Sequence, residues 1–571
     1  MDIGALYDLW LSKALEDKDL TDELIKIKGD DAAIYERFYR ELEFGTGGLR
    51  GIIGAGSYRL NIYTIRKATQ GLACYLKEMT TNPSVAIAYD SRIKSDLFAK
   101  SAAEVFAGNG IKVYMYSELM PTPMLSFAVR ALKTDAGIVV TASHNPAKYN
   151  GYKVYGNDGC QMTIDAANKV LENIEKVDTF DGVQRLSFEQ GISEGLINYI
   201  NDSVINEYYE NVLNQSVNKS LLSEIPLKII YTPLNGAGNK PVRAVLDKIG
   251  IRDITIVKEQ ELPDGNFPTI PFPNPEIRQV FEIAIGMAKQ IKPDILLATD
   301  PDCDRVGIAV RQKDEFILMS GNEVGVLLLD YLLAQRSKNG TMPKNPMAVK
   351  TIVTTPLASL VAQKYGCEII DVLTGFKFIG EQIGLLEQKG EANRYIFGFE
   401  ESYGYLAGSY VRDKDAVVGS MLICEMAAFY KKQGKTLIDV MSEIYEEHGY
   451  YLNTQESFEF EGSSGMEKMN KMMTLLRETA PVQIGSIKVL AIADYLTSSM
   501  YDLKTEESSP ITLPKSDVLC YFLSDGANVI IRPSGTEPKI KAYISTKGYN
   551  LDEAQILADS IKKDIPKLLG I

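Results

Sequence analysis

A serine on a predicted turn is the first residue of this 571-residue chain whose surroundings suit chemistry. Ser143 follows the apolar run 137–140, which predicts a buried strand, so the serine is expected at the carboxyl end of a sheet. Asn145 and Pro146 stop a helix from continuing and favour a shaped loop, and Lys153 follows closely. Such a serine can carry or accept a phosphate. On this motif alone, a serine that only caps a turn remains the alternative.

Three aspartates at alternate positions, Asp300, Asp302 and Asp304, follow a second apolar run. Their carboxylates can converge on one hard divalent cation, because oxygen ligands suit magnesium or calcium. An EF-hand loop would need glycine at its sixth position and glutamate at its twelfth, where this chain has Arg305 and Arg311. Three protein carboxylates leave coordination positions for water or a substrate phosphate, which is typical of magnesium. An acidic, solvated turn is the alternative.

A third motif combines an arginine, two hydroxyls and a lysine between two predicted short strands. It consists of Arg532, Ser534, Gly535, Thr536 and Lys539. Positive side chains and free backbone amides around a glycine form a compact anion site, and its expected ligand is a phosphate. An ordinary Pro-Ser-Gly turn would leave the pairing of the two cations unexplained.

A fourth motif places a glutamate and a serine side by side on a glycine-bounded loop. Glu400 and Ser402 could hydrogen bond to vicinal hydroxyls of a sugar, and Lys414 follows soon after. Alone, this signal is weak, because an ordinary strand-to-helix turn has the same composition.

In this order and spacing, the four motifs resemble those of the α-D-phosphohexomutase superfamily, over essentially the whole chain. The segment 44–51, which includes Arg50, is similar to the glycine-rich signature of that superfamily, and 320–323 is similar to the start of its third domain. The segments 264–268 and 273–276 look most like those of the longer bacterial phosphoglucomutases and of animal relatives that also act on pentose phosphates.

The resemblance implies a phosphoglucomutase, an isomerase that interconverts α-D-glucose 1-phosphate and glucose 6-phosphate through phosphorylated Ser143. Glucose 1,6-bisphosphate would be its intermediate and activator. One Mg²⁺ per subunit would be held by the three aspartates together with Ser143. Lys153 would act as general base if neighbouring positive charge lowers its pKa, and Arg50 would stabilise charge on the transferring phosphate. The implied substrate contacts are Arg305, Glu400, Ser402, Lys414, Arg532, Ser534, Gly535, Thr536 and Lys539.

Other functions stay open. Phosphomannomutase or phosphopentomutase activity, alone or in addition, would use the same motifs, and a non-catalytic phosphosugar-binding homologue or a magnesium-dependent phosphatase are further alternatives. A serine hydrolase is disfavoured because the chain has two histidines. His144 adjoins the serine and is expected to shape the loop or hydrogen bond within it, and His448 lies near a predicted helix end.

An internal repeat predicts the architecture. The segments 87–116, 229–257 and 350–372 each read as strand, loop, helix, glycine and strand. We therefore expect an α/β protein with three related α/β domains that contain mixed sheets, and a smaller carboxyl-terminal α+β domain, around a central cleft. The expected domains are 1–205 with the phosphoserine loop, 206–319 with the metal loop, 320–450 with the sugar loop and 451–571 with the phosphate loop.

Composition narrows location and partners. A formal charge of −14 argues against nucleic acid binding, and 45% hydrophobic residues suit a large multidomain enzyme. No secretory signal is apparent, and 416–429 is too short for a membrane span, so we expect a cytoplasmic protein. We expect a small phosphosugar as its ligand, and a monomer or weak homodimer. The six cysteines are scattered without a zinc or disulfide pattern. Cys303 lies between Asp302 and Asp304 in the segment 300–304, called the aspartate loop below, and could make this predicted metal site sensitive to oxidation or soft metals.

Overall fold

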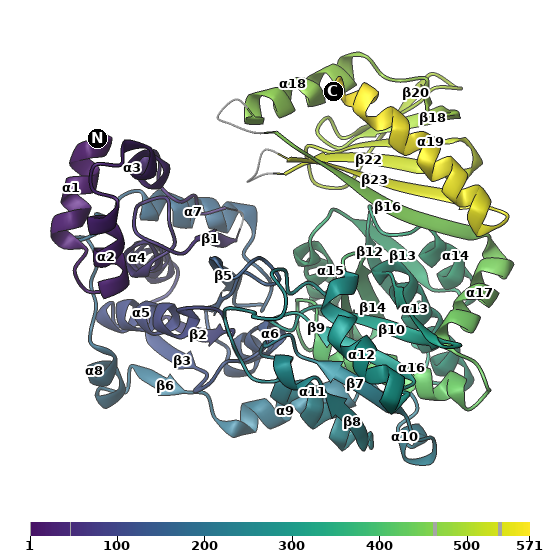
Figure 1. Ribbon diagram of the computed structural model, residues 1–571, viewed down its shortest axis with the longest axis horizontal. Coiled ribbons are helices and arrows are strands. Elements are labelled where there is room, and N and C mark those ends of the chain that lie inside the picture. Colours follow the sequence, from purple (N-terminus) through teal and green to yellow (C-terminus); the bar gives the residue numbers. More distant parts are fainter. Residues whose placement is uncertain (1, 46, 461–464, 535–538) are drawn as a thin grey trace. The chain divides into compact units, whose positions relative to one another are not determined.

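The computed structural model describes residues 2–45, 47–460, 465–534 and 539–571 (Figure 1). Its packing divides the chain into two units, each described by itself below. The first unit comprises residues 1–320, 379–398 and 402–434, and the second comprises 321–378, 399–401 and 435–571. The predicted four-domain division stays a prediction.

The predicted repeat is present in three sheets. In the first it is β2 (Ser84–Tyr89), α5 (Ser95–Gly108) and β3 (Lys112–Met115); in the second β7 (Lys228–Thr232), α11 (Asn239–Lys248) and β8 (Asp253–Ile256); in the third β12 (Met347–Thr351), α14 (Leu357–Lys364) and β13 (Glu368–Val372). Each strand pair is parallel. A helix connects each pair because parallel neighbours need a long crossover.

The first sheet has six strands in the order β1-β5-β4-β2-β3-β6. Its central strand β4 (Ala136–Val140) is buried at every position, as its apolar run predicts. β5 (Tyr149–Gly156) turns back antiparallel to β4, which places Lys153 opposite Val139 near the carboxyl end of β4. On its other side β5 pairs with β1 (Gly48–Ile52), which carries Arg50.

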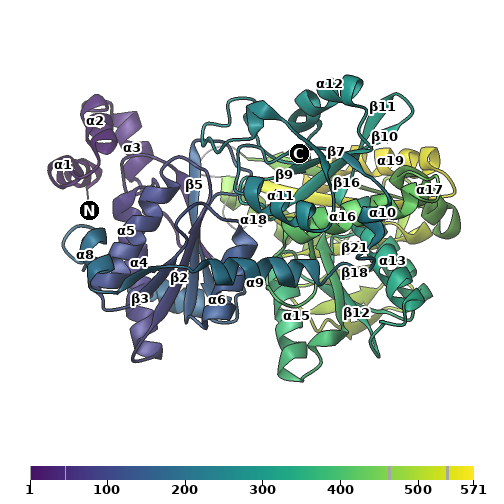
Figure 2. The same ribbon diagram turned by 90° about the horizontal axis from the view of Figure 1, so that it is seen from below.

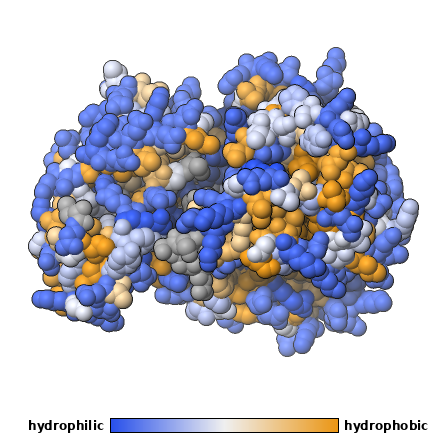
Figure 3. Space-filling view, turned by 90° about the horizontal axis from the view of Figure 1, so that it is seen from above, coloured by the Kyte–Doolittle hydropathy of each residue, from blue (hydrophilic) through white to orange (hydrophobic). Residues whose placement is uncertain are grey.

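Helices cover both faces of this sheet. α4 (Ile62–Met79) and α5 lie on one face and α6 (Thr122–Leu132) on the other (Figure 2). The first unit further contains α1 (Ile3–Lys13), α2 (Lys18–Lys26), α3 (Asp31–Phe38), α7 (Ile164–Ile174), α8 (Phe188–Ser193), β6 (Ile197–Tyr199), α9 (Asp202–Leu213) and α10 (Leu221–Glu224). Polar residues cover much of the face shown in Figure 3, with apolar patches between them.

The second sheet has five strands in the order β11-β10-β9-β7-β8. β9 (Ile295–Thr299) is fully buried and pairs antiparallel with β10 (Val306–Gln312), so the aspartate loop is the turn that joins these two strands. β11 (Glu315–Met319) lies at the edge. α12 (Glu282–Ile291) and α16 (Ala416–Lys431) belong to the same unit, and α16 is buried over most of its length, as expected for a core helix.

The third sheet has the order β13-β12-β14-β15. β14 (Tyr395–Glu400) ends on the predicted sugar glutamate, and β15 (Gly404–Ala407) begins four residues later. The helices near it in the sequence are α13 (Gly321–Lys338), α15 (Phe376–Gln388) and α17 (Leu437–His448). α17 ends at His448 because Gly449 has a φ of 98°.

The carboxyl-terminal part is a largely antiparallel sheet in the order β16-β23-β22-β21-β18-β19-β20, with β17 beside β18. Its strands are β16 (Tyr450–Glu459), β17 (Gln483–Ile484), β18 (Ile487–Asp494), β19 (Ser499–Asp502), β20 (Glu507–Pro510), β21 (Leu519–Leu523), β22 (Asn528–Pro533) and β23 (Lys539–Gly548). α18 (Gly465–Glu478) and α19 (Leu551–Leu569) contribute to its core. The predicted α/β fold class is confirmed. Across the described residues, no helix has the length and apolar character that a membrane span needs.

Candidate active site

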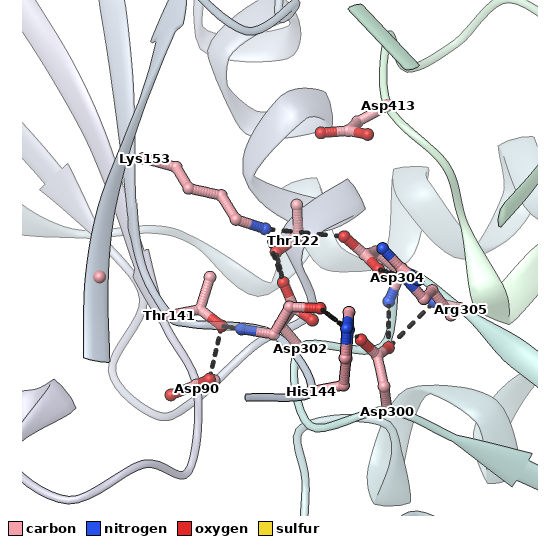
Figure 4. A network of polar contacts seen from close by, with 12 residues as sticks. Asp90, Thr122, Thr141, His144, Lys153, Asp300, Asp302, Asp304, Arg305 and Asp413 are labelled. Carbon is pink, nitrogen blue, oxygen red and sulfur yellow. Dashed lines mark hydrogen bonds and ion pairs between the residues drawn. The ribbon is translucent and has the colours of Figure 1, made fainter. Parts of the chain in front are cut away.

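Ser143 lies on a tight turn after β4, where the sequence places it. Its backbone has a φ of 51°, which is unusual for a residue with a side chain. The hydroxyl donates a hydrogen bond to Asp300 Oδ2 at 2.7 Å, and His144 Nδ1 lies 3.1 Å from the same Oγ (Figure 4). The structure therefore brings together the first two motifs, which lie 157 residues apart in the sequence.

The three aspartates form one buried cluster. Asp300, Asp302 and Asp304 are at most 1% exposed, and one carboxylate oxygen from each lies within 4.8 Å of the others. Oδ1 of Asp302 and Oδ1 of Asp304 have no hydrogen-bond partner within the described part of the chain. Buried carboxylate oxygens without donors are costly unless a cation occupies them, so this cluster fits a hard divalent ion.

Backbone contacts fix the shape of the aspartate loop. Asp300 Oδ1 accepts from the backbone N–H groups of Asp304 at 3.1 Å and Arg305 at 3.0 Å, which closes the turn between β9 and β10. The side chain of Thr122 donates to Asp302 Oδ2 at 2.9 Å, and its N–H donates to the Asp302 carbonyl at 2.9 Å. The amino terminus of α16 adds a bond from Ala416 N–H to the Cys303 carbonyl at 3.3 Å.

Two lysines from distant elements balance the carboxylates. Lys153 Nζ lies 3.0 Å from Asp302 Oδ2 and 3.7 Å from Asp304 Oδ2, and Lys414 Nζ lies 3.0 Å from Asp304 Oδ2. Lys414 also contacts Asp413, which accepts a hydrogen bond from Tyr155 at 2.7 Å. The predicted residues Ser143, Lys153, Lys414 and the three aspartates thus share one buried, charged site.

The pKa values of Asp300 and Asp302 shift in opposite directions. Burial, and then the charges of Asp302 and Asp304, raise the pKa of Asp300 well above its usual range. Burial would also raise the pKa of Asp302, but Lys153 and hydrogen bonding from Asp300 outweigh it and lower that pKa. The shifts oppose each other because like charges held close together disfavour the ionised form of one carboxylate, while a nearby ammonium favours that of the other.

Lys153 has no depressed pKa in this arrangement. Burial opposes its charged form, but Asp302 and Asp304 outweigh burial and raise the pKa of Lys153. A role as general base therefore requires that a cation take over these two carboxylates. For His144, burial and then the charges of Arg305 and Arg50 lower the pKa, so the ring beside Ser143 is neutral.

Cys303 sits in the aspartate loop with a φ of 52°, and it is fully buried. Burial, and then the nearby charge of Asp300, raise the pKa of its thiol well above the usual range. Its side chain hydrogen bonds with Thr299, and it does not belong to the carboxylate cluster. The thiol is therefore poorly placed to react or to bind a soft metal.

Three further predicted site residues belong to the first unit. Arg305 pairs with Glu276 at 2.7 Å, and its backbone bridges to Gly404 beside the sugar loop. Arg50 is exposed on β1, and Ser402 is half-buried.

The second unit holds the glutamate and the phosphate motif. Glu400, 5% exposed at the end of β14, accepts from the N–H of Gly375 at 3.0 Å. Arg532 and Ser534 are half-buried at the end of β22, and Ser534 N–H donates to the Lys539 carbonyl at 2.7 Å. Lys539 Nζ pairs with Glu459 at 2.9 Å. Two predicted residues of this motif, Gly535 and Thr536, lie outside the described residues.

Sequence reasoning missed three residues that hold the loop that carries Ser143. Thr141 accepts from Ser143 N–H at 2.8 Å and donates to Asp90 at 2.6 Å. The side chain of Arg92 donates to the Ser143 carbonyl. The sequence signal for Asp90 and Arg92 is the Asp-Ser-Arg segment directly after the first strand of the repeat, which predicts their place at the same sheet edge as Ser143 but not their contacts.

A buried hydroxyl beside three carboxylates and two lysines, on repeated α/β sheets, is an arrangement suited to metal-assisted phosphoryl transfer. Comparisons with known proteins give the family. Residues 41–181, 206–313 and 320–448 match the models of phosphoglucomutase/phosphomannomutase α/β/α domains I, II and III. The chain belongs to the phosphoglucomutase/phosphomannomutase family, and the resemblance predicted from the motifs is confirmed.

Similar proteins agree over nearly the full length. A phosphoglucomutase of Staphylococcus aureus strain USA300 is 39% identical over 556 residues, which cover 96% of each chain. The fold is shared with a putative phosphomannomutase of Thermus thermophilus, with a TM-score of 0.68 and 21% identity over 93% of this chain and all of that one. Parafusin of Paramecium, a phosphoglucomutase, gives a TM-score of 0.68 at 18% identity, over 93% and 97% of the two chains. The chain is thus an isomerase of the phosphotransferase type, and its relatives support phosphoglucomutase activity.

Proposed function

We propose that this protein interconverts α-D-glucose 1-phosphate and glucose 6-phosphate, with Ser143 as the residue that carries the phosphate. The observation that carries the proposal is the 2.7 Å contact between the Ser143 hydroxyl and Asp300 within the buried carboxylate cluster. The family and the 39% identical phosphoglucomutase support the choice of reaction.

Phosphorylated Ser143 would start the cycle. The 6-hydroxyl of glucose 1-phosphate attacks phosphorus, the bond from phosphorus to Ser143 Oγ breaks, and glucose 1,6-bisphosphate forms. The bisphosphate reorients, Ser143 Oγ attacks the phosphorus on C1, the bond from that phosphorus to the C1 oxygen breaks, and glucose 6-phosphate is left. Lys153, whose amine lies in the cluster at 3.0 Å from Asp302, takes the proton of the attacking hydroxyl, and the Ser143 oxygen that leaves phosphorus takes up a proton in turn. The second transfer runs these proton steps in reverse.

Asp300, Asp302 and Asp304 would hold one Mg²⁺, with an oxygen on Ser143 as a further ligand. That ion would withdraw charge from the transferring phosphoryl group. With its carboxylate neighbours engaged as ligands, Lys153 would lose the charges that raise its pKa, and could exist as the free amine.

Recognition would fall to other residues. Glu400 and Ser402 bind ring hydroxyls, Arg305, Arg50 and Lys414 stabilise phosphate charge, and the second phosphate binds to Arg532, Ser534 and Lys539, together with Gly535 and Thr536. We propose a small phosphosugar ligand, neither nucleic acid nor membrane as partner, a monomer or weak homodimer, and a cytoplasmic location.

Phosphomannomutase activity is the second candidate, because the matched family models describe both enzymes. Mannose 1-phosphate differs from glucose 1-phosphate at the 2-hydroxyl, so a pocket without a contact there discriminates weakly. Pentose phosphates are a further substrate class to include in the test.

The test incubates the protein with Mg²⁺, glucose 1-phosphate and a trace of glucose 1,6-bisphosphate, while glucose 6-phosphate and inorganic phosphate are measured together. We expect glucose 6-phosphate without phosphate release, and its loss in Ser143→Ala. Phosphate release alone would establish a phosphatase instead. With neither product from glucose, mannose or pentose phosphates, a non-catalytic binding role would replace this proposal.

A further inference from the structure

The guanidinium of Arg92 lies beneath the loop that carries Ser143, and it is part of the first unit. Arg92 is 3% exposed. Its Nε and Nη2 donate to the Ser143 carbonyl at 3.2 Å and 2.5 Å. Its Nη1 donates to the carbonyls of Pro146 at 3.0 Å and Tyr149 at 2.9 Å, and its Nη2 also donates to the carbonyl of Asn145. One side chain thereby satisfies four carbonyls of a loop that has little regular structure of its own.

The peptide of Ser143 is held from both sides. Its N–H donates to Thr141 Oγ1 at 2.8 Å, and its carbonyl accepts from Arg92. Asp90 joins the two anchors, because it accepts from Thr141 at 2.6 Å and from the backbone N–H of Arg92 at 2.9 Å. A serine with a φ of 51° keeps this conformation only where its surroundings impose it.

Arg92 is itself covered by a segment that the proposed reaction leaves without a role. The ring of Phe267, 2% exposed, has its centroid 5.1 Å from the guanidinium carbon. Gly265 lies flat against the same backbone: a Cβ there would stand 2.4 Å from Ile93 N and 2.8 Å from the carbonyl carbon of Arg92. The segment 264–268 is therefore built to pack on Arg92.

We propose that Arg92 is a positioning residue that sets the place of the Ser143 hydroxyl beside Asp300, and that Phe267 holds Arg92 in that geometry. This inference rests on the proposed function, since it requires Ser143 to be the reacting group. In this inference, the segment 264–268 holds the loop that carries Ser143 in place through Arg92, and it makes no contact with substrate.

The expected signature is a loss of kcat with little change in KM, because the proposed substrate contacts lie elsewhere. Lysine in place of Arg92 keeps the charge but cannot reach four carbonyls with one ammonium group. A misplacement of about 1 Å at a reacting atom costs about a hundredfold in rate, which sets the expected loss for Arg92→Lys. Phe267→Leu keeps apolar volume and removes the ring face, and we expect a loss of about tenfold.

The experiment compares these two variants with the same substitutions elsewhere in the unit. Arg66→Lys replaces another buried arginine, 7% exposed, and Phe281→Leu replaces a fully buried ring in the hydrophobic core that packs against the second sheet. For each protein, kcat, KM, the midpoint of thermal unfolding and the rate at which glucose 1,6-bisphosphate phosphorylates Ser143, followed by intact mass, are measured. The controls should lose stability and keep kcat.

Equal kcat in Arg92→Lys and Arg66→Lys would overturn the inference, as would a rise in KM without a fall in kcat. If Arg92→Lys does not fold, Phe267→Leu against Phe281→Leu decides. Wild-type turnover tests the proposed function separately: without it both proposals fall, whereas an active wild type with an unaffected Phe267→Leu overturns only this one.

Discussion

The residues proposed for chemistry and those proposed for recognition differ in how their charges are held. In the first unit, Asp302 and Lys153 form a buried pair at 3.0 Å, and so do Asp304 and Lys414. In the second unit, Lys539 is paired with Glu459, whose side chain is 74% exposed. Buried charges interact strongly and stay in place, whereas exposed pairs are weak and adjust.

This difference predicts which kinetic constant each region controls. A preorganised cluster of charged groups stabilises the charge that develops in the transition state and so lowers the activation barrier. Changes in the first unit should therefore reduce kcat. Contacts to a phosphate that does not react bind the ground state and the transition state alike, so changes in the second unit should raise KM.

Asp300→Asn should have the largest effect, because it removes a charge from the carboxylate that touches Ser143. Asparagine keeps the size and one acceptor oxygen, so the fold should persist while turnover falls about a thousandfold. The measurement is kcat over a Mg²⁺ titration. Asp314→Asn, at an exposed turn of the same sheet, is the control. Full turnover in Asp300→Asn, or turnover that survives chelation of Mg²⁺, would remove the metal from the proposal.

Lys153→Met should leave substrate binding nearly intact and reduce kcat about a hundredfold, because the proposed general base is gone. The loss of a positive charge beside Asp302 also leaves that carboxylate buried without its partner, so a lower unfolding temperature is expected. Steady-state kinetics and thermal unfolding are measured together, with Lys112→Met at an exposed position of the first sheet as control. Near-normal kcat would assign the base to another residue.

The sequence predicts the fold well where local pattern decides structure. The three repeats predict parallel strand pairs, and the apolar runs 137–140 and 295–298 coincide with the buried strands β4 and β9. Spacing along one strand or one loop could also predict the aspartate cluster, because alternate residues on a tight turn can face a common point. These features depend on residues close in sequence.

The sequence could not predict contacts between distant segments. Nothing in the composition of Asp90 or Arg92 shows that their side chains reach the Ser143 loop, 51 residues further on. The expectation for Lys153 depended on surrounding charge, and the structure puts two carboxylates next to it. Loop packing and local electrostatics follow from tertiary structure, which a single sequence does not display.

Arg532→Lys should raise KM about tenfold and change kcat little, because lysine loses the forked donors that suit a phosphate. Arg477→Lys is the matched control in the same unit, where the arginine bridges Asp494 at 3.1 Å and Asp517 at 2.6 Å. The control should lower stability without a change in KM. A fall in kcat at constant KM would place Arg532 among the groups that act in the transition state, and would break the proposed division between the two regions.

Glu459→Gln should have the smallest effect and the opposite sign. Glu459 pairs with Lys539 at 2.9 Å and so competes with a bound phosphate for that lysine. Glutamine has no charge and releases Lys539, so KM should fall about twofold, the size expected for an exposed ion pair. Hydrogen bonding and charge from Lys539 lower the pKa of Glu459, so the carboxylate stays charged across neutral pH, and the difference in KM between variant and wild type should be the same at pH 6 and pH 8. Glu456→Gln, on the same strand with its own partner Lys562 at 3.5 Å, is the control. A higher KM in Glu459→Gln would mean that the pair orients Lys539 for the phosphate, and the second unit would then be preorganised like the first.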